Sequence, residues 1–383
     1  MKKICFITTV PITIKAFILK TANYIHENTD WDISVICSND EDFGKTLPEY
    51  IHYYPVHMER GISLSGVKAM LQMKKIFHEQ QFDLIQYSTP NAAMYASMAG
   101  QMAGVPVRLY CQWGMAYKGM NGLKRKIFKI MEKTICRFST EIEPDSRSNL
   151  KFAHEQKLYP SNIGNVIWNG SACGVDLVKF DINKKEQYRE DIRNRYSITD
   201  NDFLFGFVGR ITRDKGINEL LSSFKVISEK NNNAYLMIVG SNEVGDAVDK
   251  ELYNWSINDS KVIYTGFTDV VEQYLSAMDC YILPSYHEGF GMSIIEAEAM
   301  GLPVIVTNIP GPIDAMINDE TGIIVKKADK DTLIGAMEEL LNDNDKLLSY
   351  GNAALNYARN NFDQKVMLEQ ILADRKRLLK EDN

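Results

Sequence analysis

The stretch Cys280-Tyr-Ile-Leu-Pro-Ser-Tyr-His-Glu-Gly-Phe-Gly-Met-Ser-Ile-Ile-Glu-Ala-Glu-Ala-Met300 decides the fold. It opens with four apolar residues before a proline, as expected of a strand buried on both faces of a parallel sheet. Gly289 and Gly291 then permit a tight backbone turn. The residues that follow have helical composition and periodicity. The stretch therefore predicts a strand, a glycine turn and a helix, with Glu288 in the turn and Glu296 on the helix.

The turn between this strand and this helix is suited to binding an anion or a sugar. The first amides of a helix lack partners within the helix and lie at the positive end of its dipole, so they hold phosphate or sugar oxygens well. The two carboxylates suit pairs of hydroxyls, with Glu288 placed to accept hydrogen bonds from a hexose and Glu296 from a ribose. The ordinary alternative is that both are exposed surface residues, as most glutamates are.

Short apolar runs alternate with helical segments along the 383-residue chain. The rhythm predicts an α/β fold in which right-handed crossovers join parallel strands and place helices on both faces of a sheet. The chain is too long for one ordinary core, so we expect two doubly wound, Rossmann-like domains. The expected strands are residues 4–7, 33–37, 84–87, 107–111, 166–168, 204–208, 235–239, 262–264, 280–283 and 304–306.

The rhythm lapses between residues 169 and 201, where a glycine turn is followed by a charged segment. We therefore expect an N-terminal domain over residues 1–176 and a second domain over residues 177–361. Residues 362–383 read as a final helix with two adjacent apolar rows.

Composition limits the classes of function. A net charge of −7 argues against a general nucleic-acid binder. The six cysteines include no C-x-x-C pair and mostly lie in apolar runs, which favours buried thiols in a reducing compartment. The first apolar run is too short for a signal peptide, and none is long enough to cross a bilayer. We expect a cytoplasmic protein that meets membranes only at their surface.

A second constellation lies in Gly206-Phe-Val-Gly-Arg-Ile-Thr-Arg-Asp-Lys-Gly216, where a predicted strand leads into a loop with Arg210, Arg213 and Lys215. Ligands of open α/β sheets bind at the carboxyl ends of the strands. Cations at this position would neutralise a diphosphate and stabilise it as a leaving group. The alternative is a solvated basic loop.

The two constellations together resemble a retaining, family-4-type glycosyltransferase of the GT-B fold, in which two Rossmann-like domains face each other across a cleft. The resemblance covers nearly the whole chain. Glu288-Gly-Phe-Gly-Met-Ser-Ile-Ile-Glu296 is similar to the family's E-x7-E segment, and Gly209-Arg210 with Lys215-Gly216 is similar to its diphosphate-binding pair.

The resemblance implies roles for individual residues. Arg210 and Lys215 would hold the diphosphate of a nucleotide-sugar donor, and Glu288 would orient the sugar. The remaining donor-binding positions would be the amides of Gly289, Phe290, Gly291 and Met292, the ribose ligand Glu296, and the loop at Gly266 and Phe267 beside the base. The final helix would pack back onto the first, acceptor-binding domain. No metal or other cofactor is expected, since the Asp-x-Asp pairs read as turns or caps and the six histidines lack metal-ligand spacing.

Three further segments resemble the subgroup that builds capsular or O-antigen repeat units: residues 7–15, 142–146 and 169–176. This resemblance implies a UDP-activated hexose or N-acetylhexosamine as donor and a polyprenyl-diphosphate-linked or oligosaccharide acceptor. The main alternative is a UDP-N-acetylhexosamine epimerase of the same fold. The chain could also be an inactive scaffold or a NAD-dependent oxidoreductase.

One departure from the family concerns the N-terminal domain. Many relatives carry a histidine after the strand that faces the reaction centre, where this chain has Trp113. In a front-face retaining mechanism the leaving diphosphate accepts the proton of the acceptor hydroxyl, so a protein base is not required. Gln112 and Trp113 would then shape the acceptor pocket. A structural tryptophan is the alternative, and no general base is assigned.

Residues 118–137 are strongly basic. Seven Lys or Arg and one Glu give this stretch a charge of +6 and leave the rest of the chain at −13. Apolar residues at helical spacing predict an amphipathic basic helix, which an anionic membrane surface would attract. Peripheral association with the inner face of the cell membrane is therefore expected. The alternative is a core-packed helix with a solvated basic face.

Overall fold

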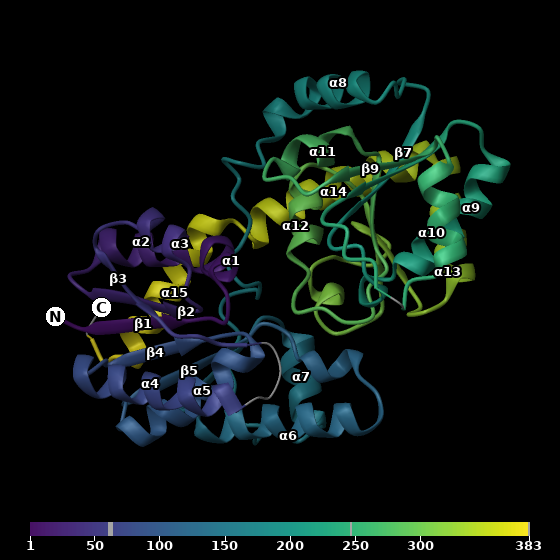
Figure 1. Cartoon of the computed structure of the whole chain (residues 1–383). Coiled ribbons are helices and arrows are strands. Elements are labelled where there is room, and N and C mark those ends of the chain that lie inside the picture. Colours follow the sequence, from purple (N-terminus) through teal and green to yellow (C-terminus); the bar gives the residue numbers. More distant parts are fainter. Residues whose placement is uncertain (60–63, 246, 382–383) are drawn as a thin grey trace. The chain divides into compact units, whose positions relative to one another are not determined.

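The computed structural model describes residues 1–59, 64–245 and 247–381, and the chain forms two compact units. Unit 1 comprises Met1–Cys173 together with the segment that begins at Lys365, and unit 2 comprises Gly174–Gln364 (Figure 1). The boundaries expected from the sequence followed residues 176 and 361, so each differs from the observed one by three residues.

Unit 1 is built on a six-stranded sheet with the order β3-β2-β1-β4-β5-β6, in which all neighbouring strands are parallel. The strand order reverses between β1 and β4, as in a Rossmann sheet. The strands are β1 (Lys3–Ile7), β2 (Asp32–Cys37), β3 (Ile51–Pro55), β4 (Leu84–Tyr87), β5 (Val107–Gln112) and β6 (Glu141–Pro144).

Helices cover both faces of this sheet. α4, α5 and α6 lie on one face, and α2, α3 and α15 on the other (Figure 1). Each face has its own apolar cluster, because strands of a parallel sheet are buried on both sides. The helices are α1 (Pro11–Thr13), α2 (Leu19–Asn28), α3 (Glu41–Thr46), α4 (Leu64–Gln80), α5 (Pro90–Ala103), α6 (Gly122–Phe138), α7 (Arg147–Glu155) and α15 (Gln364–Leu378).

Unit 2 repeats the same topology. Its six parallel strands have the order β12-β11-β10-β7-β8-β9, so the reversal falls between β7 and β10. The strands are β7 (Phe203–Val208), β8 (Ala234–Val239), β9 (Val262–Gly266), β10 (Cys280–Leu283), β11 (Val304–Thr307) and β12 (Gly322–Val325).

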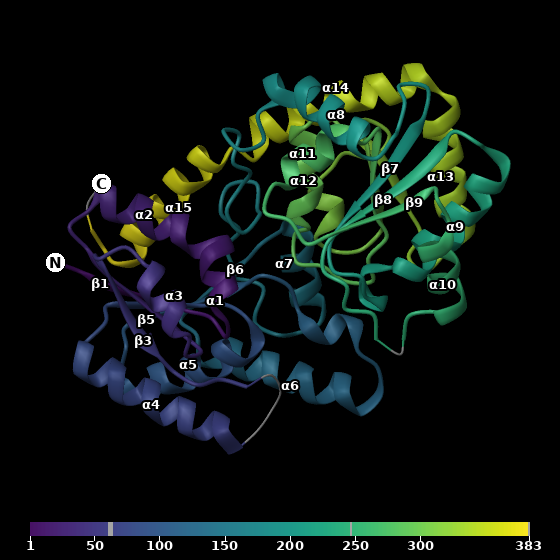
Figure 2. The ribbon, with the colours of Figure 1, turned by 45° about the horizontal axis from the view of Figure 1, so that its top comes forward.

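The helices of unit 2 also form two layers. α9, α10 and α13 lie on one side of the sheet, and α8, α11, α12 and α14 on the other (Figure 2). Their bounds are α8 (Lys185–Arg195), α9 (Ile217–Lys230), α10 (Lys250–Asn258), α11 (Val271–Ala277), α12 (Met292–Ala299), α13 (Lys330–Asn342) and α14 (Asn344–Asn361). The two doubly wound sheets confirm the fold class expected from the sequence.

The C-terminal helix α15 packs on unit 1. Met367 and Ile371 bury against Ile167, and Leu372 joins the cluster beneath α2 and α3. Arg375 is completely buried, and its guanidinium donates to Glu143 Oε2 at the end of β6 over 2.5 Å and to Gln86 Oε1 on β4 over 3.1 Å. Apolar contacts and a buried ion pair therefore fix α15 to the sheet of unit 1.

The structure corrects one expected strand and adds three. Residues 166–168 form irregular chain that turns at Trp168, because Ile167 packs against α15 instead of joining the sheet. The unforeseen strands are β3, β6 and β12. β3 is a half-exposed edge strand that contains His52 and two tyrosines, and β6 carries two glutamates, so neither reads as a continuous apolar run. β12, at the edge of the unit 2 sheet, is a short apolar run that the βα rhythm did not single out.

Of the helices formed by the described residues, none has the length and apolar character needed to cross a membrane.

Candidate active site

The predicted donor residues lie at the carboxyl ends of β7 and β10, the two strands at which the order of the unit 2 sheet reverses. The crevice at such a reversal is the usual ligand site of open α/β sheets. The loop after β7 ends at Gly216, whose φ is +75°. A Cβ atom there would lie 2.0 Å from the carbonyl oxygen of Pro284, at the end of β10. Only glycine lets the two loops approach this closely.

This close approach brings Lys215 and Glu288 together. Lys215 Nζ donates to Glu288 Oε1 over 2.6 Å, and the two side chains are only 20% and 11% exposed. Ser285 Oγ donates to the same oxygen over 2.7 Å, and Thr307 at the end of β11 holds the Ser285 carbonyl over 2.6 Å. The carboxylate is thus oriented by groups from three neighbouring strand ends, which is how an active site preorganises a charged group.

Arg210, the other predicted diphosphate ligand, is held less firmly. Its guanidinium lies 3.1 Å from Glu243 Oε2 and 3.6 Å from Asp214 Oδ2, and the side chain is 49% exposed. Ion pairs this exposed contribute little to stability. Another anion could therefore replace these carboxylates around Arg210 at small cost.

Arg213 is excluded from the same role by its contacts. Its guanidinium donates to Glu219 Oε2 over 2.8 Å and to the Tyr286 hydroxyl, and it stacks 4.2 Å from the centre of the Tyr286 ring. Tyr286 in turn donates to Glu219 over 2.7 Å. This cluster holds the loop before Glu288 in place, and the Arg213 guanidinium is already bonded to Glu219 and Tyr286.

The amino end of α12 adjoins the pair, as the sequence predicts. Gly291 has a φ of +92° and begins the helix, so the amides of Met292 and its neighbours form the first turn. The Tyr281 hydroxyl on β10 lies 2.7 Å from Ser293 Oγ and fixes this turn to the sheet. Phe290 is buried against Phe362 with ring centres 5.3 Å apart. Its side chain belongs to the core, and only its backbone can meet a ligand.

Glu296 lies about one turn after Met292 in α12. The sequence does not reveal the environment of its carboxylate. Burial raises its pKa to about 7, an effect that nearby Lys179 opposes and Glu272 reinforces. Lys179 Nζ lies 3.7 Å from the buried Glu272 Oε2 and donates to the carbonyl of Asp269 over 2.7 Å. Lys179 and Glu272 lie 117 and 24 residues from Glu296, and no motif joins them.

The raised pKa of Glu296 predicts a pH-dependent affinity for a ribose-bearing donor. The ionised carboxylate accepts two charge-assisted hydrogen bonds from vicinal hydroxyls, whereas the protonated form has lost its charge and must donate one. We expect the donor KM to fall several-fold as the pH rises through about 7, the pKa of this group. Initial rates at varied donor concentration test this. Glu296→Gln should abolish the dependence, and an unchanged slope in that variant would contradict the assignment.

Gly266 is the last residue of β9, the edge strand two positions from β7, and Phe267 follows it. Gly266 has a φ of +76°, and the Phe267 ring is 66% exposed. An exposed aromatic at a strand end suits stacking on a base, and this role stays a prediction.

In unit 1 the two acceptor candidates differ in accessibility. Gln112 is completely buried, with its amide nitrogen 2.5 Å from Glu132 Oε1 and its oxygen 3.1 Å from the Tyr159 hydroxyl. Burial raises the pKa of Glu132 to about 7, which its hydrogen bonds from Gln112 and Tyr110 counteract. Trp113 is partly exposed and packs against Phe17, with ring centres 5.6 Å apart. Of the pair, Trp113 is the side chain that an acceptor could touch.

Among the residues that the structure describes, no group of three or more His, Cys, Asp or Glu side chains is arranged to hold a metal ion. Metal independence stays a prediction for the reaction itself.

Comparison with protein families gives two matches. Residues 188–357 match the model "Glycosyl transferases group 1", and residues 3–146 match "Glycosyl transferase 4-like". The first match contains β7, β10 and α12, and therefore every candidate donor residue in unit 2.

Individual relatives extend these matches along the chain. The capsular polysaccharide biosynthesis glycosyltransferase CapM of Staphylococcus aureus is 30% identical over 353 residues, which cover 91% of each chain. An α-1,3-galactosyltransferase of Escherichia coli, acting from UDP-Gal on α-D-GlcNAc-diphosphoundecaprenol, is 27% identical over 331 residues, or 82% and 81% of the two chains.

The fold also occurs in solved structures. Sucrose-phosphate synthase from Thermosynechococcus elongatus superposes with a TM-score of 0.81 at 18% identity, covering 99% of this chain and 100% of the other. Two observations support the same family. One is the Lys215–Glu288 pair at the point where the strand order of the unit 2 sheet reverses, and the other is the near full-length similarity to CapM. The chain belongs to the group 1 glycosyltransferases, with a 4-like N-terminal domain.

Proposed function

We propose that the enzyme transfers a hexose or N-acetylhexosamine, with retention of configuration, from a UDP-sugar to a lipid-diphosphate-linked saccharide during synthesis of a capsular or O-antigen-type polysaccharide. The observation that carries this proposal is the Lys215–Glu288 pair at the switch point of unit 2, beside the first turn of α12. A cation, an oriented carboxylate and helix amides are the groups that a sugar diphosphate requires.

Each group has a role in the proposed reaction. Lys215 and Arg210 bind the diphosphate and stabilise the charge that develops on it as the glycosidic bond breaks. Glu288 holds a hydroxyl of the donor sugar, and Glu296 holds the ribose. The departing phosphate oxygen accepts the proton of the acceptor hydroxyl as the new bond forms, so no carboxylate or histidine is needed as a base. The donor needs no metal when these cations are present.

The relatives support the donor and acceptor classes. CapM is named for capsular polysaccharide biosynthesis, and the E. coli relative for UDP-Gal and a diphosphoundecaprenol-linked acceptor. Both are transferases, which favours transfer over epimerisation. Incubation with UDP-sugar alone separates the two reactions, because an epimerase would convert the donor without any acceptor.

The first experiment is a thermal-shift panel of nucleotide sugars, because a ligand that binds the folded protein raises its melting temperature by mass action. We expect one UDP-sugar to raise the melting temperature by the largest amount and the same sugar to be transferred to a prenyl-diphosphate-linked saccharide. UDP-glucose, UDP-galactose and their N-acetyl forms are the essential members, with GDP-mannose as the contrasting base. A response to GDP-mannose alone would remove the UDP assignment.

Association with an anionic membrane surface is part of the proposal, through α6 of unit 1. Leu123, Ile127 and Ile130 on this helix are exposed, while Met131 and Ile135 pack inward. Exposed apolar side chains beside cations characterise helices that lie in a membrane interface. Two of the cations in residues 118–137 have partners within the protein, because Lys118 donates to Asn149 and Lys129 to Gln156.

We therefore expect reversal of charge at the amino end of α6 to weaken membrane binding. Each cation contributes about 1 kcal/mol near an anionic bilayer. The combined change Lys124→Glu, Arg125→Glu and Lys126→Glu should remove most co-flotation with vesicles containing phosphatidylglycerol and leave neutral vesicles unbound. Lys74→Glu with Lys75→Glu on α4, where Lys75 is exposed and Lys74 half-buried, is the control. Equal flotation of all three proteins would refute the role of α6.

A further inference from the structure

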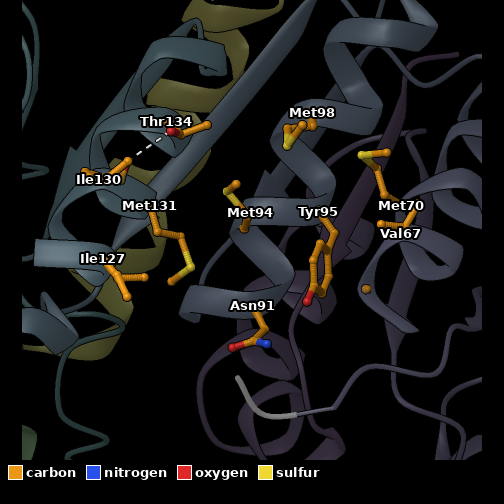
Figure 3. Close-up of a pocket in the computed structure, with 11 residues that line it drawn as sticks. Val67, Met70, Asn91, Met94, Tyr95, Met98, Ile127, Ile130, Met131 and Thr134 are labelled. Atoms are coloured by element: carbon orange, nitrogen blue, oxygen red, sulfur yellow. Dashed lines mark hydrogen bonds between the residues drawn. The ribbon is translucent and has the colours of Figure 1, made fainter. Parts of the chain in front are cut away.

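A pocket of about 370 Å³ lies in unit 1 between α4, α5 and α6, outside the donor site (Figure 3). Its lining is almost entirely apolar. Met70 of α4, Met94 and Met98 of α5, and Ile127, Ile130 and Met131 of α6 contribute most of it. In Figure 3 the Met94, Met98 and Met131 side chains point into the space between α5 and α6. Unlike a core cavity, this pocket includes residues that are exposed.

The rim of the pocket is apolar at the protein surface. Val67 is 51% exposed, Ile127 40% and Ile130 65%. Large exposed apolar groups that adjoin a cavity mark a binding surface, because leaving them in water costs free energy that a ligand would recover. Such a lining selects a hydrocarbon and offers few hydrogen bonds to a polar ligand.

Cations lie beside the apolar rim on the same helix. Lys126 and Lys133 are exposed and lie about one helical turn before and after Ile130, so they share its side of α6. The pocket therefore adjoins positive charge that suits a phosphate. This combination matches one kind of molecule, a long hydrocarbon chain attached to an anionic head group.

The methionines allow the pocket to fit a branched chain. A methionine side chain is unbranched and polarisable, and its rotatable bonds let it fit irregular shapes. An isoprenoid chain carries a methyl branch on each unit and so presents such an irregular shape. On this basis, and resting on the lipid-diphosphate acceptor of the proposed function, we propose that the pocket binds the part of a polyprenyl chain nearest its phosphate.

In this arrangement the chain leaves the bilayer along α6, its first isoprene units enter the pocket, and Lys126 and Lys133 contact the phosphate. The pocket thus recognises the lipid part of the acceptor and contributes to KM without touching the reacting atoms. It adds a chain-specific contact to the general attraction between α6 and an anionic surface.

Direct binding tests the proposal without requiring transfer. The probe is geranylgeranyl phosphate below its micelle concentration, titrated calorimetrically, with hexadecyl phosphate as a straight-chain ligand of the same head group. Met98→Trp fills the pocket, and Val67→Glu places a charge on its half-exposed rim. Met102→Trp, at a 49% exposed position on the same helix outside the lining, is the matched control.

We expect wild type and Met102→Trp to bind geranylgeranyl phosphate equally and more tightly than hexadecyl phosphate. Met98→Trp and Val67→Glu should each weaken binding about tenfold or more, since displacing two buried methylene groups alone has an effect of that size. Val67→Glu changes a surface residue, so it keeps the test valid if Met98→Trp fails to fold. Equal affinities in wild type and both variants, or equal affinity for the straight chain, would overturn the proposal.

Two further readouts separate this proposal from competing explanations. In the transfer assay, both variants should raise KM for a prenyl-linked acceptor and leave the rate with a short water-soluble acceptor unchanged. Absence of transfer in the wild type would refute the proposed function, whereas the binding result would stand by itself. Sedimentation that shows a dimer lost in Val67→Glu and Met98→Trp would instead assign the surface to a second copy of the chain and overturn the lipid assignment.

Discussion

Lys215→Ala is expected to reduce turnover by about 10²- to 10³-fold, the typical result of removing one preorganised group that stabilises transition-state charge. The ammonium group is 2.6 Å from Glu288 and only 20% exposed, so water cannot replace it effectively. The loss should appear in kcat more than in donor KM, because the charge on the diphosphate grows as the glycosidic bond breaks.

Glu288→Gln is the companion change. It keeps the shape of the side chain and removes the charge that Lys215 and Ser285 hold in place. We expect a similar loss of turnover and a lower melting temperature, because Lys215 is left in a mostly buried position without its charged partner. Measurements of kcat and KM with saturating acceptor test both variants.

A matched control removes another ion pair of the same unit. Lys230 Nζ, on the last residue of α9, lies 2.7 Å from the half-buried Glu338 of α13. The pair lies at the end of α9 that is opposite to Lys215. Lys230→Ala should leave the rate within about twofold of the wild type, since exposed pairs contribute little. Wild-type turnover in Lys215→Ala would remove this residue from the mechanism, and equal losses in both lysine variants would point to a general effect of charge.

Arg375→Met is expected to destabilise unit 1 by about 3–5 kcal/mol, the cost of breaking a buried ion pair by removing one partner. Arg375 is completely buried, and Glu143, which it contacts at 2.5 Å, is 8% exposed. The variant leaves the Glu143 carboxylate without this partner in an environment that water hardly reaches.

Chemical denaturation measures this effect, with Arg377→Met as the control. Arg377 is two residues away on the same helix, binds Asp374 over 2.7 Å and is 58% exposed, so its loss should cost less than about 1 kcal/mol. Combining Arg375→Met with Glu143→Leu should recover part of the stability, because it removes both charges of this pair. Asp374, which Arg375 also contacts at 2.8 Å, keeps its ion pair with Arg377. Equal denaturation midpoints for Arg375→Met and Arg377→Met would show that the buried pair does not fix α15 to unit 1.

The sequence predicts the fold best where the signal is local. Buried parallel strands appear as apolar runs, so β1, β7 and β10 were located to within a few residues. β6 was not predicted, because Glu141 and Glu143 interrupt its apolar character. The partner that makes Glu143 acceptable in the sheet is Arg375, 232 residues further along the chain. The run at 166–168 was wrongly predicted as a strand for the related reason that its apolar side chain packs against α15.

The same distinction between local and distant contributions applies to the candidate site. The positions of Arg210, Lys215, Glu288 and Glu296 at strand ends follow from the motif and the βα rhythm. The pairing, exposure and pKa of these side chains do not follow from the sequence. Lys215 is paired and mostly buried, Arg210 is half exposed, Arg213 is committed to Tyr286 and Glu219, and Glu296 has a raised pKa. Each of these differences arises from neighbours contributed by other strands and helices.

The sequence by itself determined the two doubly wound sheets, the glycine turns and the residues that gather at the unit 2 switch point, because apolar periodicity and backbone freedom are properties of short segments. Only the tertiary structure decided which charges meet, how deeply each is buried, and that a methionine-lined pocket adjoins the basic helix α6. Such features depend on residues far apart in the chain, and burial and pairing follow from the distances that folding sets between them.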